Sequence, residues 1–336
     1  MLDRIERLCA ADGTSGDEEA VRRLILAEID GFCRWEIDPL GNILVEKEGR
    51  KPAVRRVMID AHTDEVGLIV THITEDGFLH FKTVGGIDPA VLMCRRVKIG
   101  GKVEGVIGGK PIHLTDKEEA KKLPKTDQMT IDIGAETRAE AGSRVAVGDR
   151  AVWVSETVRN GTLIKAKALD DRIGCAALIT LLREESEYGF CGSFSVQEEV
   201  GLRGARVAAH HLNPDFALVL EATTAADIAG VSAENEVCNL GKGVAVSFMD
   251  GATVYDRALY DAALQSGIPC QPKRGTSGGN DSGAVHLSRD GVRTLALSVP
   301  CRYLHSPACV SDVRDIAAQV DLARYLTQKI AGGMLG

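Results

Sequence analysis

The stretch VRRVMIDAHTDEVG (54–67) decides the fold of this chain. Its apolar run ends close to His62, which predicts a buried strand with a histidine at its carboxyl end. In open α/β sheets, ligands collect at that edge. The sequence pattern changes directly after this stretch, at about residue 67. The same segment therefore marks a predicted ligand position and a predicted domain boundary.

From residue 67 to 161 the chain carries short β-type runs separated by Asp-Gly, Gly-Gly and Gly-Asp turns, with little helical periodicity. This pattern predicts an inserted all-β, barrel-like domain of about 95 residues. One stretch within it, TDKEEAKKLPKTDQ (115–128), is rich in lysine and glutamate and predicts a solvated loop or a short exposed helix.

Strands and helices alternate on both sides of the insertion. Two helices open the chain, and SGDE (15–18) before the second matches a capping box. The strands LIKAKALDD (163–171), GSFSVQEE (192–199) and FALVLEAT (216–223) are each followed by a helical pattern or a polar loop. The alternation predicts an α/β fold with a mainly parallel central sheet and helices on both faces. Residues 1–66 and 162–336 would form this domain.

Composition limits the possible partners. The chain has 336 residues and a formal net charge of −8, which disfavours nucleic acid and anionic membranes. It has no apolar run long enough to span a bilayer, and its first residues do not resemble a signal peptide. The nine cysteines are scattered without a C-x-x-C pair, as expected for reduced thiols. These features predict a cytoplasmic protein.

Two strand ends combine residues that suit metal binding. His62 is followed by Asp64, whose carboxylate could fold back to fix the orientation of a metal-bound imidazole. The alternative is that both residues merely satisfy hydrogen bonds of a loop. Asp170 and Asp171 precede a helix, where aspartate is often an ordinary cap. We assign a metal-bridging role to Asp170 and the capping role to Asp171.

Three further positions repeat this context. Adjacent strand residues face opposite sides, so Glu198 and Glu199 can share one site only where the strand has ended. One could then bind metal while the other takes a proton from metal-bound water. Glu221 is expected to end a very apolar run, where a lone acid is costly without a cation. His305 follows another strand of the buried type. A solvated turn remains the alternative for the glutamate pair.

The chain resembles the tetrahedral aminopeptidase family, which includes deblocking and glutamyl aminopeptidases and members labelled as cellulases. The strings that carry the resemblance span essentially the whole chain: AHTDEVG (61–67), ALDDRIG (168–174), VQEEVGLRGA (196–205), LGKG (240–243), SGGNDSGA (277–284) and PCRYLHSP (300–307). The resemblance implies a metal-dependent aminopeptidase that removes N-terminal residues from short peptides with free N-termini. It also implies homo-oligomers, with dimers built into a dodecamer through the inserted domain.

The resemblance further implies two divalent ions, zinc or alternatively cobalt. His62 and Glu221 would hold one ion, Glu199 and His305 the other, and Asp170 would bridge them. Glu198 would act as general base toward a metal-activated water, and Asp64 would orient His62. Two positions depart from the family pattern. The position of Glu221 is commonly aspartate, and the usual Gly-Gly-Thr-Asp string has asparagine at Asn280.

Other functions remain open at this point. A deacylase of related fold, acting on N-acyl amino acids or peptides, would need a basic group for the substrate carboxylate. Candidates are Lys242, Lys273, Arg274 and Arg302. A glycosidase fits less well, because it needs two metal-free carboxylates at a set separation. A non-catalytic metal-binding scaffold is also disfavoured, because structural zinc sites prefer closed sets of Cys and His ligands.

Overall fold

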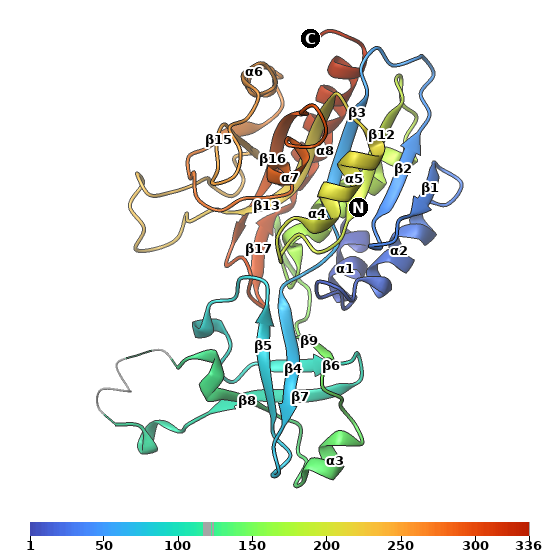
Figure 1. The fold of residues 1–336 in the computed structure, drawn as a ribbon. Coiled ribbons are helices and arrows are strands. Elements are labelled where there is room, and N and C mark those ends of the chain that lie inside the picture. Colours follow the sequence, from blue (N-terminus) through green and yellow to red (C-terminus); the bar gives the residue numbers. More distant parts are fainter. Residues whose placement is uncertain (117–121, 123, 336) are drawn as a thin grey trace.

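A sheet of eleven strands forms the centre of the larger part of the molecule (Figure 1). The computed structural model describes residues 1–116, 122 and 124–335. The strands of this sheet are β1 (Arg34–Ile37), β2 (Ile43–Lys47), β3 (Val57–His62), β10 (Val158–Asn160), β11 (Leu163–Ala166), β12 (Phe190–Ser195), β13 (Phe216–Thr224), β14 (Val244–Ser247), β15 (Cys270–Lys273), β16 (Arg293–Arg302) and β17 (Cys309–Asp312).

The centre of the sheet is parallel. Strands β12, β3, β13 and β16 lie side by side in this order, and each neighbouring pair runs in the same direction. Strands β2 and β17 pair antiparallel with the two sides of this group. The predicted α/β sheet is therefore confirmed. Strands β14 and β15 form a further parallel pair at its side, and the other neighbouring strands pair antiparallel.

Helices cover both faces of the sheet, as predicted (Figure 1). Helices α4 and α8 pack on one face and α5 and α7 on the other, while α1 and α2 pack against α4. Val57 and Ile59 of β3 join the core under α4 and α8, and Met58 joins the core under α5. The helices of this part are α1 (Leu2–Ala10), α2 (Glu19–Ile29), α4 (Leu169–Arg183), α5 (Arg203–Leu212), α6 (Arg257–Leu264), α7 (Ser282–Val285) and α8 (Val313–Ala331).

The insertion forms a closed antiparallel barrel with its own apolar core, which confirms the predicted β fold. Its strands follow the order β4, β5, β8, β7, β6, β9. Residues 117–121 and 123 of the lysine- and glutamate-rich stretch lie outside the described residues. The elements of this part are β4 (Gly67–Ile73), β5 (Leu79–Val84), η1 (Pro89–Val91), β6 (Arg96–Ile99), β7 (Val103–Gly109), η2 (Ile112–Leu114), η4 (Thr126–Gln128), β8 (Met129–Asp132), α3 (Arg138–Gly142) and β9 (Arg150–Trp153).

The barrel ends earlier than the predicted limit at residue 161. Its last strand, β9, ends at Trp153, and β10 pairs with β11 in the large sheet. Leu68 of β4 lies opposite Ala151 of β9, so the chain enters and leaves the barrel side by side. Figure 1 shows the barrel below the sheet, connected through these strands.

A buried ionic cluster lies where the chain leaves β3 for the barrel. Glu65, Lys167 and Arg172 are all nearly inaccessible to solvent. Lys167 Nζ lies 2.5 Å from Glu65 Oε1, and Arg172 Nη2 lies 3.5 Å from the same oxygen. Arg172 also donates to the carbonyl of Leu8. The cluster joins the segment after β3 to the start of α4.

Among the described residues, no helix is long and apolar enough to cross a membrane.

Candidate metal centre

The carboxyl edge of the parallel strands gathers most of the candidate residues. His62 is the last residue of β3. Glu198 and Glu199 follow the end of β12, and His305 follows the end of β16. Because these strands run in the same direction, their carboxyl ends lie at one edge of the sheet. The structure thus brings these four side chains together around one cavity.

The prediction that Glu221 ends its strand is wrong. Strand β13 continues to Thr224, and its ladder with β16 runs on to the pair Thr224–Cys301. Backbone pairing with this long neighbour carries the strand past the apolar run. Glu221 therefore lies inside the strand, where it is 4% exposed and still lines the cavity.

The two neighbouring aspartates have different surroundings. Asp171 Oδ1 accepts a hydrogen bond from Gly174 N at 2.9 Å, so Asp171 caps the first turn of α4. Asp170 departs from helical geometry and lines the cavity. Its Oδ1 lies 3.5 Å from His62 Nε2, and its Oδ2 lies 3.3 Å from His305 Nε2. One carboxylate thus contacts two imidazoles through different oxygens.

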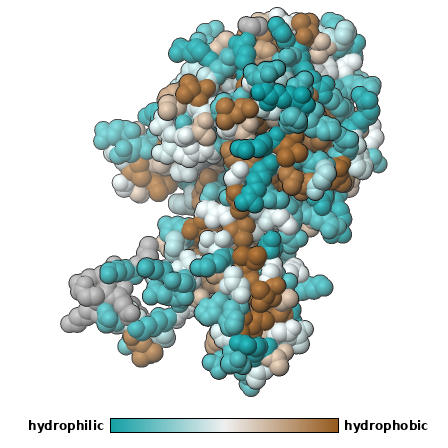
Figure 2. All heavy atoms as spheres, viewed as in Figure 1, coloured by the Kyte–Doolittle hydropathy of each residue, from teal (hydrophilic) through white to brown (hydrophobic). Residues whose placement is uncertain are grey.

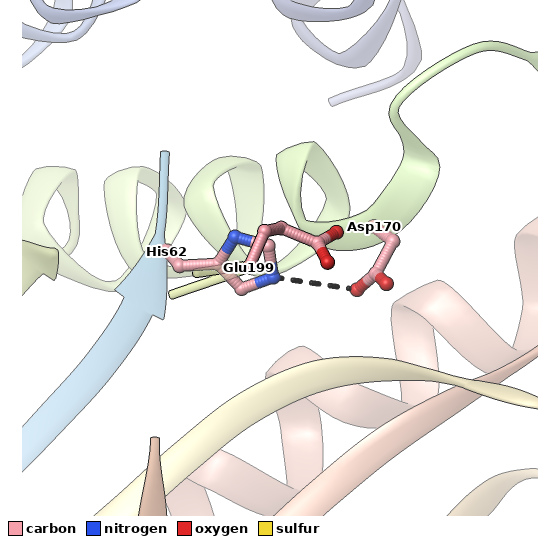
Figure 3. A group of neighbouring side chains, drawn as sticks. All are labelled: His62, Asp170 and Glu199. Atoms are coloured by element: carbon pink, nitrogen blue, oxygen red, sulfur yellow. Dashed lines mark ion pairs between the residues drawn. The ribbon is translucent and has the colours of Figure 1, made fainter. Parts of the chain in front are cut away.

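A glutamate accompanies each of these imidazoles. His62 Nε2 lies 3.7 Å from Glu221 Oε2, and His305 Nε2 lies 3.3 Å from Glu199 Oε1. Figure 3 shows His62, at the end of β3, next to Asp170 and Glu199, and one ligand atom of each lies within 4.8 Å of the others. The cluster has two halves, each a histidine with a glutamate, and Asp170 lies between them.

Asp64 connects the histidine to the glutamate pair. It is fully buried, and its Oδ1 lies 3.5 Å from His62 Nδ1. Asp64 Oδ1 accepts from Glu198 N at 2.9 Å, and Oδ2 accepts from Glu199 N at 3.2 Å. The Ser15 hydroxyl donates to Asp64 Oδ2 at 2.6 Å. Asp64 therefore holds the backbone that carries both glutamates.

The contact of Ser15 with Asp64 corrects the predicted capping box. Helix α2 begins at Glu19 without a side-chain cap, and Glu18 accepts from Gly16 N instead. The Ser15 hydroxyl is unavailable to the helix because it bonds to the buried carboxylate of Asp64. The local pattern resembled a cap, but a residue far along the chain determines its partner.

The cluster has an excess of acidic groups. Burial raises the pKa of Glu198 to about 8, and Glu199 and Asp170 add to the rise although His62 opposes it. At His305, burial lowers the pKa of the imidazole, but Asp170 and Glu199 outweigh burial and raise that pKa to about 11. Burial likewise raises the pKa of Glu221 well above its usual range. Among the described residues, only His62 and His305 form ion pairs with Asp170, Glu199 and Glu221.

Several carboxylate oxygens in the cluster have no hydrogen-bond partner among the described residues. They are Asp170 Oδ1, Asp171 Oδ2, Glu199 Oε1 and Glu221 Oε1. A buried polar atom without a partner costs free energy, and more so when its group is charged. Carboxylate oxygens and imidazole nitrogens are common ligands of zinc and related divalent ions. The residues therefore fit a metal centre.

The cluster forms one wall of a cavity of about 750 Å³. Glu198 also lines it, although no histidine contacts its carboxylate within 4.0 Å in the described part of the chain. Gly275, Gly278 and Gly279 also line the cavity. The volume is within the usual range for small-ligand sites.

Asn280, one of the departures from the family pattern, has a structural role. Its Nδ2 donates to Tyr255 Oη at 3.0 Å and to Asp250 Oδ2 at 3.3 Å, and its Oδ1 accepts from Ser282 N. A second supporting residue, Gln319 of α8, donates to the carbonyl of Glu221 at 3.0 Å. Sequence reasoning missed Gln319, because a glutamine within a helix gives no local signal of this contact.

Comparison with known proteins gives the same family as the motifs. The M42 glutamyl aminopeptidase family model matches residues 41–322. A glutamyl aminopeptidase from Lactococcus lactis subsp. cremoris is 32% identical over 345 residues, covering 97% of this chain and 96% of the relative.

Solved structures agree over nearly the whole chain. An aminopeptidase from the archaeon Desulfurococcus kamchatkensis matches with a TM-score of 0.91 and 31% identity, covering 99% of this chain and 98% of that one. The TET1 peptidase of Pyrococcus horikoshii, which can assemble into a tetrahedron or a large octahedral shell, matches with a TM-score of 0.85 and 34% identity. That match covers 97% of this chain and 98% of the other. The chain belongs to the M42 glutamyl aminopeptidase family.

Proposed function

We propose that this protein is a metal-dependent aminopeptidase that removes N-terminal residues from short peptides. Membership of an aminopeptidase family supports the class of reaction. The observation that carries the proposal is the position of Asp170 between two histidines, each with its own glutamate. Glu198 lines the same cavity and is not needed as a ligand.

The ligand assignment follows the two halves of the cluster. His62 and Glu221 would hold one cation, His305 and Glu199 the other, and Asp170 would contact both through its two oxygens. The unpartnered oxygens of three of these carboxylates support this arrangement. Divalent cations bound there, zinc or alternatively cobalt, supply Lewis acidity toward a water molecule and the scissile carbonyl.

Glu198 is the proposed general base. Its carboxylate accepts a proton from the attacking water and later returns it to the leaving amine. Burial raises the pKa of its carboxyl in the metal-free chain, and cations bound at the cluster would lower it toward the range in which the carboxylate is ionised and can accept a proton. Its backbone N–H donates to Asp64, which limits the movement of the side chain relative to His62.

The acidic cluster also explains removal of residues from the end of a peptide. A free α-amine could bind at the cluster, to one of the cations proposed there or to one of its carboxylates. An acetylated amine has lost its charge and carries extra bulk. Binding of the amine at the cluster would place the first peptide bond next to Glu198, and internal bonds would lie beyond it.

We further propose that the chain forms a homo-oligomer of dimers, up to a dodecamer, through its barrel. The P. horikoshii relative assembles into large shells. Figure 2 shows apolar surface on the barrel part of this chain. Among the barrel residues that the structure describes, four large apolar side chains are exposed: Phe78, Val106, Leu114 and Val147.

The first prediction separates the two adjacent glutamates. Glu198→Gln should lower kcat by about two orders of magnitude or more, because the general base is lost, while metal content stays near that of the wild type. Steady-state kinetics and elemental analysis of the purified protein measure the two quantities.

Glu199→Gln provides the matched control, since it should lose one of the two ions. The assignment is reversed if Glu198→Gln loses metal and Glu199→Gln keeps it.

The second prediction concerns the free amine. Peptides with free N-termini should be shortened one residue at a time, whereas N-acetylated copies of the same peptides should survive, because they lack the charge that the cluster binds. Mass spectrometry over a time course detects the products. A chelator should abolish the activity, and zinc or cobalt should restore it. Rapid release of acetate, or an internal cut appearing first, would favour the deacylase or another hydrolase instead.

The third prediction tests the barrel. Replacing residues 67–154 by a short Gly-Ser linker should leave a folded α/β unit, because β4 and β9 lie side by side where they join it. Light scattering should show that this variant has lost the large assembly formed by the full chain. A variant that keeps the full-size assembly would show that the interface lies elsewhere.

A further inference from the structure

Lys273 lines the same cavity as the acidic cluster, and its side chain is unusual there. It is the last residue of β15 and is only 7% exposed. No hydrogen bond or ion pair joins its ammonium group to any residue that the structure describes. Lysine is almost never buried without a partner, because removing its charge from water is costly. The cavity is where an anion could reach it.

The other basic residues near this region differ from Lys273. Arg302 donates two hydrogen bonds to Asp227, at 2.7 and 2.9 Å. Arg274, the neighbour of Lys273, is half exposed and lies 3.6 Å from Glu236. Neither of them lines the cavity. Lys273 is therefore the one of these three cations that is positioned to contact a ligand in the cavity.

The position of Lys273 relative to the cluster follows from strand order. Glu221 lies on β13, and β16 and β14 separate this strand from β15. Three strand spacings correspond to a lateral separation of roughly 14 Å between the two backbones. The four-carbon side chain of Lys273, together with one residue of a bound peptide, can span much of this distance. The three cavity-lining glycines, Gly275, Gly278 and Gly279, place no side chain in the space.

We propose that Lys273 binds a carboxylate of the substrate. This contact makes the enzyme selective for peptides whose carboxylate can reach Lys273 while their free amine lies at the cluster. The proposal rests on the aminopeptidase function proposed above. The proposed metal cluster with Glu199 and Glu221 lines one part of the cavity, and Lys273 lines another. A substrate whose free amine lies at the cluster and whose carboxylate reaches Lys273 would contact both. The carboxylate is either the side chain of an acidic N-terminal residue or the C-terminus of a short peptide.

Two substrate pairs distinguish these sources. Glutamyl- and glutaminyl-p-nitroanilide differ only in side-chain charge, whereas Leu-Gly-Gly and its C-terminal amide differ only in terminal charge. Wild-type enzyme should prefer the charged member of at least one pair by about 10-fold or more in kcat/KM, since a charge-assisted hydrogen bond is gained. The pair that shows the preference identifies the source.

Lys273→Met should reduce this preference by about 10- to 100-fold, mainly through KM. Lys273→Arg should retain most of it, which controls for a variant that folds poorly. Arg274→Gln is the matched control, because it removes the adjacent positive charge outside the cavity and should keep the wild-type preference. The proposal is wrong if the wild type prefers neither charged substrate, or if Lys273→Met keeps the preference.

A binding measurement separates this proposal from the proposed function. Calorimetry of wild type and Lys273→Met with glutamate, glutamine and triglycine reads the carboxylate contact without turnover. Carboxylate binding that depends on Lys273 in a protein that cleaves none of the anilides would support the lysine site and contradict the aminopeptidase. Cleavage of leucyl-p-nitroanilide without any charge preference would support the aminopeptidase and contradict the lysine site.

Discussion

The burial of several carboxylates around Asp170 is the constraint on which the rest of the site depends. Asp170, Glu199 and Glu221 are packed near one another, and each has an oxygen without a hydrogen-bond partner among the described residues. Two histidines are too few to balance them, and the acids raise the pKa of His305 to about 11. Such an arrangement is costly unless a cation binds, since buried charge without a partner is strongly unfavourable. The fold tolerates the cost at the one edge where its parallel strands end.

The chain separates structural charge from functional charge around this edge. Glu65 is neutralised by Lys167 and Arg172, whereas its neighbour Asp64 faces His62 and accepts from the backbone N–H groups of Glu198 and Glu199. Lys167 and Arg172 thus stabilise the connection to the barrel, and they form no ion pair with Asp170, Glu199 or Glu221. Backbone hydrogen bonds to Asp64 fix the loop after β12 without using a cluster carboxylate. Preorganisation of this kind is what a metal centre with a general base requires.

Much of this site could be predicted because its signals are local. An apolar run followed by histidine or by two glutamates marks a strand end. His62 ends β3, and Glu198 and Glu199 lie in the loop that follows β12. Glu221 was harder, because the length of β13 depends on pairing with β16 rather than on its own residues. The partner of Ser15 is similarly remote, and the limit of the barrel depends on the pairing of β10 with β11. In each of these cases a contact between residues far apart in the sequence explains why the local pattern gave a wrong prediction.

Metal stoichiometry tests the central claim most directly. Elemental analysis by mass spectrometry, after incubation with zinc and removal of loosely bound ions, should give close to two ions per wild-type chain. Asp170→Asn should bind distinctly less, because one carboxylate serves both halves of the cluster, while Asp171→Asn should lose less metal because Asp171 caps α4. A wild-type chain that retains one ion or none, or an Asp170→Asn variant that retains both, would contradict the account.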